Sequence, residues 1–337
     1  MHMANALVTP VVAGVMYSCS AVAAGYSIKK LKIEEEPKKT AVMGVMGAFV
    51  FAAQMINFTI PGTGSSGHLC GGLLLAALLG PYAGFLTMAG ILLIQCLIFA
   101  DGGILALGSN IWNIAFYGCI IGGMSIWKPI MKKGLSRSKI IIASIIGSII
   151  TLQMGAFSVA LEASASGITE LPFVEFISAM QPIHLAIALV EGLITAGLLC
   201  FIYEAKPELI WGANKVREQK KGRLSSKKVI AILSIVTILV AGGLSLAASE
   251  YPDGLEWSIE KITGSTEIEA SGEVYENFDR AQEAIAILPD YSLRNSDSAL
   301  GTSLSGIVGG FIVAISCVGG SYAFKFFRRD LVIEGKV

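Results

Sequence analysis

Apolar positions divide the chain into long hydrophobic runs separated by short polar segments. A helix needs about 20 mostly apolar residues to cross the hydrocarbon core of a bilayer. Nine runs are candidate spans, at residues 6–28, 41–60, 68–82, 84–100, 110–127, 139–161, 183–203, 229–248 and 303–324. The pattern therefore predicts an all-α polytopic membrane protein with nine transmembrane helices.

The third run is short and rich in small residues, and Gly80–Pro81 separates it from the fourth run. We interpret residues 80–84 as a tight turn between two helices, with one long kinked helix as the alternative. Two separate helices make the number of crossings odd. The termini are then expected on opposite sides of the membrane.

Basic residues are distributed very unevenly among the connecting segments. The segments after the first, fifth and seventh runs, together with the C-terminal tail, hold 22 of the 25 lysines and arginines. Only Lys261, Arg280 and Arg294 fall on the other side, which is otherwise acidic. Because short cytoplasmic loops are enriched in Lys and Arg, we expect the N-terminus outside and the C-terminus inside the cell membrane.

The composition agrees with a bilayer-embedded chain and argues against other classes. Of 337 residues, 54% are hydrophobic and 15% are charged, whereas ordinary domains carry about 25% charged residues. The 25 basic and 25 acidic residues cancel, which argues against a nucleic-acid partner because nucleic-acid binders show a basic excess. All six cysteines lie in apolar segments without a CxxC pair, and we interpret them as packing residues.

The chain also divides into parts. Residues 1–205 form a predicted seven-helix body, residues 206–228 a polar, basic cytoplasmic linker, and residues 229–337 a two-helix module with an external loop at 249–302. A segment of this loop, residues 275–288, is compatible with a helix. The acidity of the loop could concentrate cations, or the loop could present a solvated contact surface, and we prefer the second interpretation.

The three histidines, His2, His68 and His184, all fall at the outer end of this topology. A histidine directly after a free α-amino group can chelate a metal through the amine, its own main-chain nitrogen and its imidazole, in fused five- and six-membered rings. This nearly planar set leaves one corner of a square, for which His68 is the obvious donor. Four nitrogens in a plane suit Ni(II) or Cu(II), and the affinity should rise with pH because the amide loses its proton.

Each of these residues also has a structural interpretation. His2 could be an accident of the N-terminus or part of an expression tag, and His184 an interfacial, hydrogen-bonded histidine. Glu191 lies inside the seventh run, seven residues after His184, so both share a helix face and could belong to one polar network. Asp101 is interpreted by default as a turn residue; helix capping and attraction of cations are the alternatives.

The Gly-rich segment 61–68 could line a small site or close over one. Its Ser66 and His68 allow a second hypothesis, nucleophilic catalysis by an intramembrane hydrolase. The two residues are too close in sequence for an ordinary nucleophile–base pair, and no acidic residue that would orient the base is evident. The alternative roles for Ser66, His184 and Glu191 are supporting contacts around a metal site.

Several of these segments resemble the substrate-binding (S) components of nickel and cobalt energy-coupling-factor (ECF) transporters, the NikM/CbiM family. The resemblance covers most of residues 1–205 and is carried by residues 1–4, 62–72, 79–81, 101–113, 184 and 191–195. After the eighth run, Pro252–Asp253–Gly254–Leu255–Glu256 is similar to the PDGLE motif of the accessory NikN-type component. Here that component is fused to the S component.

The resemblance implies that Met1 (through its amine), His2 and His68 bind the metal, and that the chain captures Ni(II) outside for an ATP-driven importer. It also implies a T component (NikQ/CbiQ-like) and ATPase subunits (NikO/CbiO-like) on separate chains. No GxxxxGK[ST] motif occurs, so the chain itself is not expected to hydrolyse ATP. Nickel is preferred over cobalt because a planar nitrogen site favours it. A Co(II) importer subunit, an intramembrane hydrolase and a membrane metal sensor are the alternatives.

Overall fold

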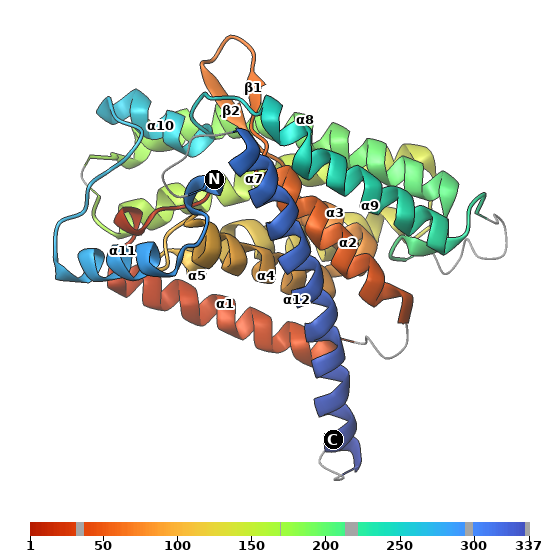
Figure 1. The fold of residues 1–337 in the computed structure, drawn as a ribbon. Coiled ribbons are helices and arrows are strands. Elements are labelled where there is room, and N and C mark those ends of the chain that lie inside the picture. The colour runs from red at the N-terminus through yellow and green to blue at the C-terminus, as the bar shows by residue number, and fades with distance from the viewer. Residues whose placement is uncertain (32–36, 169, 213–221, 294–298, 334–337) are drawn as a thin grey trace.

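The protein is a bundle of long helices with one short β-hairpin (Figure 1), seen here in a computed structural model that describes residues 1–31, 37–168, 170–212, 222–293 and 299–333. The elements up to residue 205 are α1 (Pro10–Lys30), α2 (Pro37–Gln54), β1 (Phe58–Ile60), β2 (Ser65–Gly67), α3 (Gly72–Leu79), α4 (Pro81–Phe99), α5 (Leu107–Asn110), a π-helical stretch (Ile111–Trp127), α6 (Lys128–Met131), α7 (Arg137–Ala165) and α8 (Phe173–Ala205). They are followed by α9 (Ser226–Gly242), α10 (Gly254–Thr263), α11 (Glu273–Ile285) and α12 (Ala299–Ile333).

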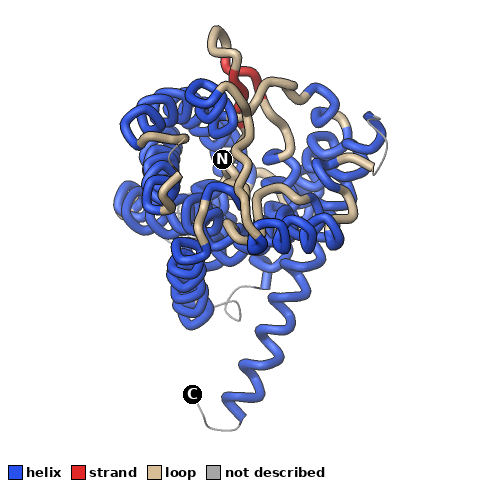
Figure 2. The backbone as a smooth tube through the Cα atoms, turned by 90° about the vertical axis from the view of Figure 1, so that its left-hand side faces the viewer, coloured by secondary structure: helices blue, strands red, loops and turns tan. Residues whose placement is uncertain are grey.

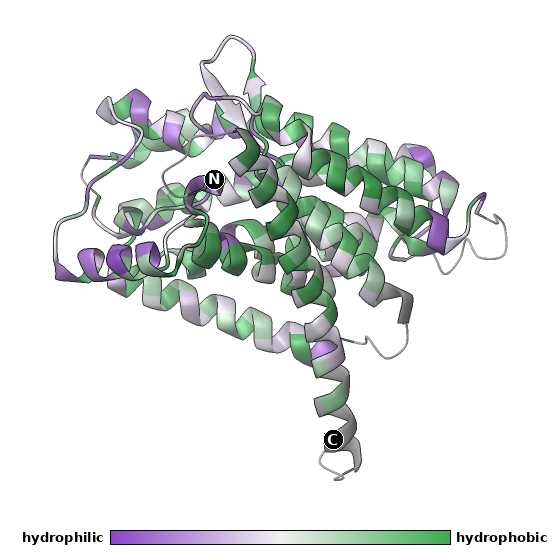
Figure 3. Cartoon of the chain, in the orientation of Figure 1, coloured by the Kyte–Doolittle hydropathy of each residue, from purple (hydrophilic) through white to green (hydrophobic). Residues whose placement is uncertain are grey.

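Six helices in the described part of the chain are long and apolar enough to cross a membrane: α1, α4, the continuous helix Leu107–Met131, α7, α8 and Leu300–Ala323 within α12. Hydrophobic residues form the middle of the bundle (Figure 3). Hydrophilic residues gather on α10 and α11 and on the described residues on either side of the segment 213–221. The mostly helical, membrane-spanning character is therefore confirmed. The count of nine crossings is not confirmed in the described residues, and the in–out orientation stays a prediction.

The third predicted span differs from the expectation. Residues 68–71 are not helical, and α3 has only eight residues, about 12 Å of helix, which is too short to cross a bilayer. Gly80 separates α3 from α4 with a φ of 83°, a conformation that favours glycine. An added Cβ on Gly84 would lie 3.0 Å from the Ala76 nitrogen, so α4 folds back closely on α3. The predicted break between two helices is confirmed, but it is Gly80 alone, because residues 81–84 already belong to the first turn of α4.

The C-terminal part packs along the body. Helix α12 lies against α2 and α9 and extends beyond the bundle toward the C-terminus (Figure 1). The segment predicted as compatible with a helix is α11. Helix α10 starts at a capping box, in which the Asp253 side chain accepts the N–H groups of Leu255 and Glu256 while the Glu256 side chain accepts the Asp253 N–H. Such reciprocal bonds satisfy main-chain donors that a helix start leaves open.

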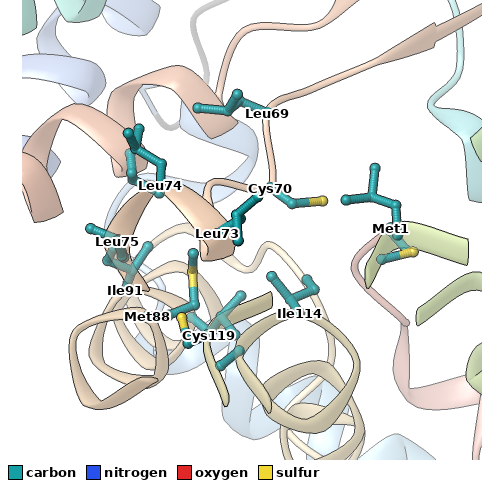
Figure 4. Packing of buried hydrophobic residues seen from close by; sticks show 14 of the residues in the cluster. Met1, Leu69, Cys70, Leu73, Leu74, Leu75, Met88, Ile91, Ile114 and Cys119 are labelled. Atoms are coloured by element: carbon teal, nitrogen blue, oxygen red, sulfur yellow. The ribbon is translucent and has the colours of Figure 1, made fainter. Parts of the chain in front are cut away.

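Some predicted features fall partly outside the described residues. The basic linker 206–228 includes residues 213–221, the C-terminal tail includes residues 334–337, and Arg294 lies in 294–298. All six cysteines are free thiols, in agreement with packing roles. Figure 4 shows the Cys70 side chain beside Met1 in the buried cluster that surrounds α3.

The N-terminus lies inside the bundle end. Viewed from the α10–α11 end, it sits among the surrounding helices and loops instead of at their margin (Figure 2). Met1 is only 4% exposed and Met3 is fully buried. A buried chain start is unusual, because termini are mostly exposed and poorly ordered unless they are tied down.

Candidate metal site

The N-terminal arm, residues 1–9, is held against the body by hydrogen bonds between main-chain groups and the side chains of Asn110 and Asn5, and by one bond between main-chain groups. Asn110 in α5 accepts the Met3 N–H at 2.7 Å through its side-chain oxygen and donates to the Met3 carbonyl at 3.1 Å. The Gly103 N–H donates to the same carbonyl at 2.8 Å. Further along the arm, the Asn5 side chain accepts the Leu105 N–H at 2.8 Å. These bonds hold Met1 and His2 against the segment that follows α4.

His68 approaches the arm from a different element. It directly follows β2, which pairs in antiparallel register with β1. The carboxyl oxygens of Glu191 in α8 accept the N–H groups of Cys70 at 2.7 Å and Gly71 at 3.1 Å, which fixes the main chain after His68. The Nδ1 atom of His68 lies 3.3 Å from the Leu69 carbonyl. Donation from Nδ1 leaves the Nε2 lone pair available as a ligand, the arrangement typical of metal-binding histidines.

The structure brings together the predicted ligands Met1, His2 and His68. The Met1 amine nitrogen lies 3.1 Å from His68 Nε2. The His2 and His68 rings stack with centroids 5.3 Å apart and an angle of 16° between their planes. In the described part of the chain, no group of three His, Cys, Asp or Glu side chains is arranged to hold a metal.

Two carboxylates that the sequence analysis did not place at the site pair with these nitrogens. Asp253, in the PDGLE-like segment, has its Oδ2 atom 2.5 Å from the Met1 amine and 3.7 Å from His68 Nε2. Asp101, interpreted from the sequence as a turn residue, has its Oδ1 atom 3.2 Å from His2 Nδ1. Each carboxylate therefore contacts a nitrogen of a predicted ligand residue. Asp253 belongs to the loop 249–302, which the sequence analysis interpreted as a solvated contact surface, and at this position the loop contacts the candidate site instead.

The charges of the site follow from burial and from these pairs. Burial disfavours the charged amine, but attraction to Asp253, Cys70 and Asp101, together with the hydrogen bond to Asp253, outweighs it, so the pKa of the Met1 amine lies above its ordinary value. Burial likewise opposes ionisation of Asp253, yet the amine and His68 hold the pKa of this carboxyl well below its usual range. Burial lowers the pKa of His2 to about 4, so this imidazole is neutral at neutral pH and does not need to lose a charge to bind a cation.

The remaining candidates lie nearby in different roles. His184 lines a small cavity together with Met1, His68 and Asp253, while its Nδ1 atom lies 2.8 Å from the Met180 carbonyl of its own helix. His184 and Glu191 are both buried, but Glu191 contacts the loop after His68. Their hydrogen bonds therefore go to different partners.

Ser66 is part of the contact between the hairpin and the PDGLE-like segment. Its hydroxyl donates to the Tyr251 carbonyl at 2.7 Å, and its N–H donates to the Pro252 carbonyl at 2.8 Å. A hydroxyl that donates to a carbonyl has no base to remove its proton, so this geometry does not activate a nucleophile. The bonds instead hold Asp253 beside His68.

Fold and site together define a multi-pass membrane protein with a buried amine–imidazole cluster, a class that suits transport of a transition metal. Residues 2–209 match the profile of the CbiM family, described as the cobalt uptake substrate-specific transmembrane region, and residues 227–326 match the PDGLE domain. The chain belongs to the CbiM family and carries a C-terminal PDGLE domain. It is therefore a metal transport protein of the nickel and cobalt group.

Relatives named for nickel transport and relatives named for cobalt transport are both similar to this chain. A protein of Archaeoglobus fulgidus with the provisional name fused nickel transport protein NikMN is 36% identical over 93% of this chain and 95% of its own length. The cobalt transport protein CbiM of Geobacter sulfurreducens is 25% identical over 66% of this chain and 65% of its own. A crystal structure of a truncated transition metal transporter superposes with a TM-score of 0.52 and 29% identity, covering 60% of this chain and 99% of that one.

Proposed function

We propose that this chain is the substrate-capture subunit of an ECF-type importer for Ni(II). Four nitrogens bind the ion: the Met1 amine, the His2 main-chain nitrogen, His2 Nδ1 and His68 Nε2. Co(II) is the alternative cargo within the same class, and the names of the relatives include both metals.

The observation that carries the proposal is the 3.1 Å distance between the Met1 amine and His68 Nε2. With metal–nitrogen bonds of about 2.0 Å, adjacent corners of a square lie about 2.8 Å apart. The amine and the imidazole, which are 67 residues apart in sequence, thus already have nearly the separation of two neighbouring ligands. Only a small closure is needed for both to contact one ion.

The charge around the cluster also favours this cargo. A divalent ion bound to one deprotonated amide carries a net charge of +1, which is costly to bury without compensation. Asp253, 2.5 Å from the amine, supplies the compensating negative charge. The same carboxylate pairs with the ammonium form of the amine.

Transport itself requires partners on other chains. We assign ATP hydrolysis to separate NikO/CbiO-like subunits and coupling to a NikQ/CbiQ-like T component in the cell membrane. Apolar side chains on α1 are exposed, with Val11 at 78% and Val22 at 73%. We assign this face of α1 to contact with lipid or with the T component.

The test is equilibrium binding of Ni(II) and Co(II) to the purified protein with its native N-terminus. Acetylation of the Met1 amine should abolish binding, because the acetylated nitrogen no longer offers an amine lone pair and the amine–amide chelate ring is lost. His68→Ala should weaken binding steeply, whereas Ser66→Ala should change it little. Nickel affinity that survives acetylation of the amine would refute the chelate. The bound Ni(II) should be diamagnetic and yellow, as expected for four planar ligands.

A further inference from the structure

Asp101 connects the metal site to the C-terminal part of the chain. One carboxyl oxygen, Oδ1, lies 3.2 Å from His2 Nδ1. The other, Oδ2, accepts a hydrogen bond from the Tyr291 hydroxyl. The main chain of Asp101 is held as well, because its N–H donates to the Gln95 carbonyl at 3.1 Å. The carboxylate thus lies between an imidazole of the arm and a phenol that follows α11.

Tyr291 is held firmly in its position. The Gln95 side chain donates to the phenol oxygen at 3.1 Å. The ring stacks on Phe99 at a centroid distance of 4.9 Å and meets Phe51 edge-on at 6.1 Å. Burial, and then the nearby Asp101, raise the pKa of the Tyr291 phenol well above its usual range. The hydroxyl therefore keeps its proton and donates, and the hydrogen bonds run in one direction from Gln95 through Tyr291 to Asp101.

The His2 ring needs a fixed acceptor in the metal-bound state. The chelate uses Nδ1, so Nε2 then carries the proton. Within the described residues, the buried His2 Nε2 atom has no hydrogen-bond partner. A half-turn about the Cβ–Cγ bond exchanges Nδ1 with Cδ2 and Cε1 with Nε2. Nε2 then moves to the side that faces Asp101, and Nδ1 is released for the metal. An Asp101 carboxylate held in place can accept from either nitrogen.

We propose that Tyr291 is a positioning residue of the metal site, which fixes Asp101 and thereby the orientation of the His2 imidazole. This inference rests on the chelate proposed above. Partners of metal-bound histidines change metal affinity about 10- to 100-fold. Tyr291 stands one residue further from the metal, so we expect an effect of about 3- to 10-fold.

The experiment measures Ni(II) affinity, Ni(II) dissociation rate and the visible spectrum of Tyr291→Phe, which keeps the stacked ring and removes only the hydroxyl. Weaker binding, faster dissociation and an absorption band at longer wavelength are expected, because a poorly oriented imidazole gives a weaker ligand field. The matched control is Tyr203→Phe, near the C-terminal end of α8. Its hydroxyl also donates to a main-chain carbonyl, that of Leu135 at 3.5 Å, but this bond does not involve the arm. This control should bind Ni(II) like the parent, with an unchanged spectrum.

A double-variant cycle separates the proposed route from a general loss of packing. If Tyr291 acts through Asp101, Tyr291→Phe should have no further effect in an Asp101→Ala background. An equal loss in that background would overturn the inference. Parent-like affinity and spectrum of Tyr291→Phe, together with weak binding by His68→Ala, would also overturn it and leave the chelate intact. Parent-like binding by His68→Ala would instead refute the chelate, and the inference with it.

Discussion

Replacement of Glu191 tests how the structure holds His68 in place. Its side chain is buried, and its two oxygens accept the N–H groups of Cys70 and Gly71. Glu191→Gln keeps the size but turns an NH2 group toward one of these donors, so one hydrogen bond is lost. A hydrogen bond to a charged group contributes about 1.5–3 kcal/mol. If the whole loss falls on the docked conformation of the His68 segment, Ni(II) binding weakens about 10- to 150-fold, because about 1.4 kcal/mol corresponds to tenfold.

The assay is competition for Ni(II) between a chelator and the detergent-purified protein, with thermal unfolding measured in parallel. Glu204→Gln is the matched control, because Glu204 lies on the same helix but is 43% exposed, in a 3.7 Å ion pair with Arg137. An exposed pair of this kind contributes little, so the control should bind like the parent. If folded Glu191→Gln protein bound Ni(II) within about twofold of the parent, the reasoning about the His68 segment would be wrong.

Three further outcomes are expected. Asn110→Ala removes both side-chain bonds to the Met3 main chain. Ni(II) affinity should fall about tenfold, and acylating reagents should label the N-terminal amine faster. Unchanged labelling would contradict the position of the arm in the structure. Gly72→Ala places a Cβ 2.7 Å from the Gly118 Cα and should lower the free energy of unfolding by about 1–3 kcal/mol, whereas Gly90→Ala, with nothing within 4 Å, should not. Ni(II) affinity should rise with pH, because binding removes protons from the amide and from an amine whose pKa is raised; a flat profile in a pH titration would contradict the chelate.

The hydrophobic runs predicted most long helices because length and apolar composition are local properties of a membrane span. The third run shows where this reasoning fails. Its apolar residues are those of a buried protein core, since every residue of α3 is buried. Periodicity and hydropathy cannot distinguish burial in protein from burial in lipid. Gly71 and Gly80, both at positive φ, mark the ends of this short helix.

Met1 and His2 could be proposed as ligands from the sequence, because the amine and the His2 nitrogens belong to adjacent residues and chelate rings depend only on covalent geometry. His68 could be added as the remaining donor because it falls at the outer end of the predicted topology. Asp253 and Asp101 could not be placed in this way. Asp253 is 252 residues from the amine it contacts, and the D-x-x-E spacing of its segment indicates only a helix start. The capping role uses Oδ1, and only the folded structure shows that Oδ2 is directed at the amine.

The arm is held from two sides, which bears on how the proposed chelate can form. From the body, the Asn110 side chain forms hydrogen bonds with the Met3 main chain. From the C-terminal part, the Asp279 carboxylate accepts from the Asn5 side chain at 2.6 Å, and Asp253 pairs with the amine. A free N-terminus would lose about 1–2 kcal/mol of backbone entropy per residue on ordering, and a metal would have to offset this loss. Because these bonds restrict the arm without any contribution from a metal, less of this entropy remains to be lost on binding, which raises the affinity of a site made of so few ligands.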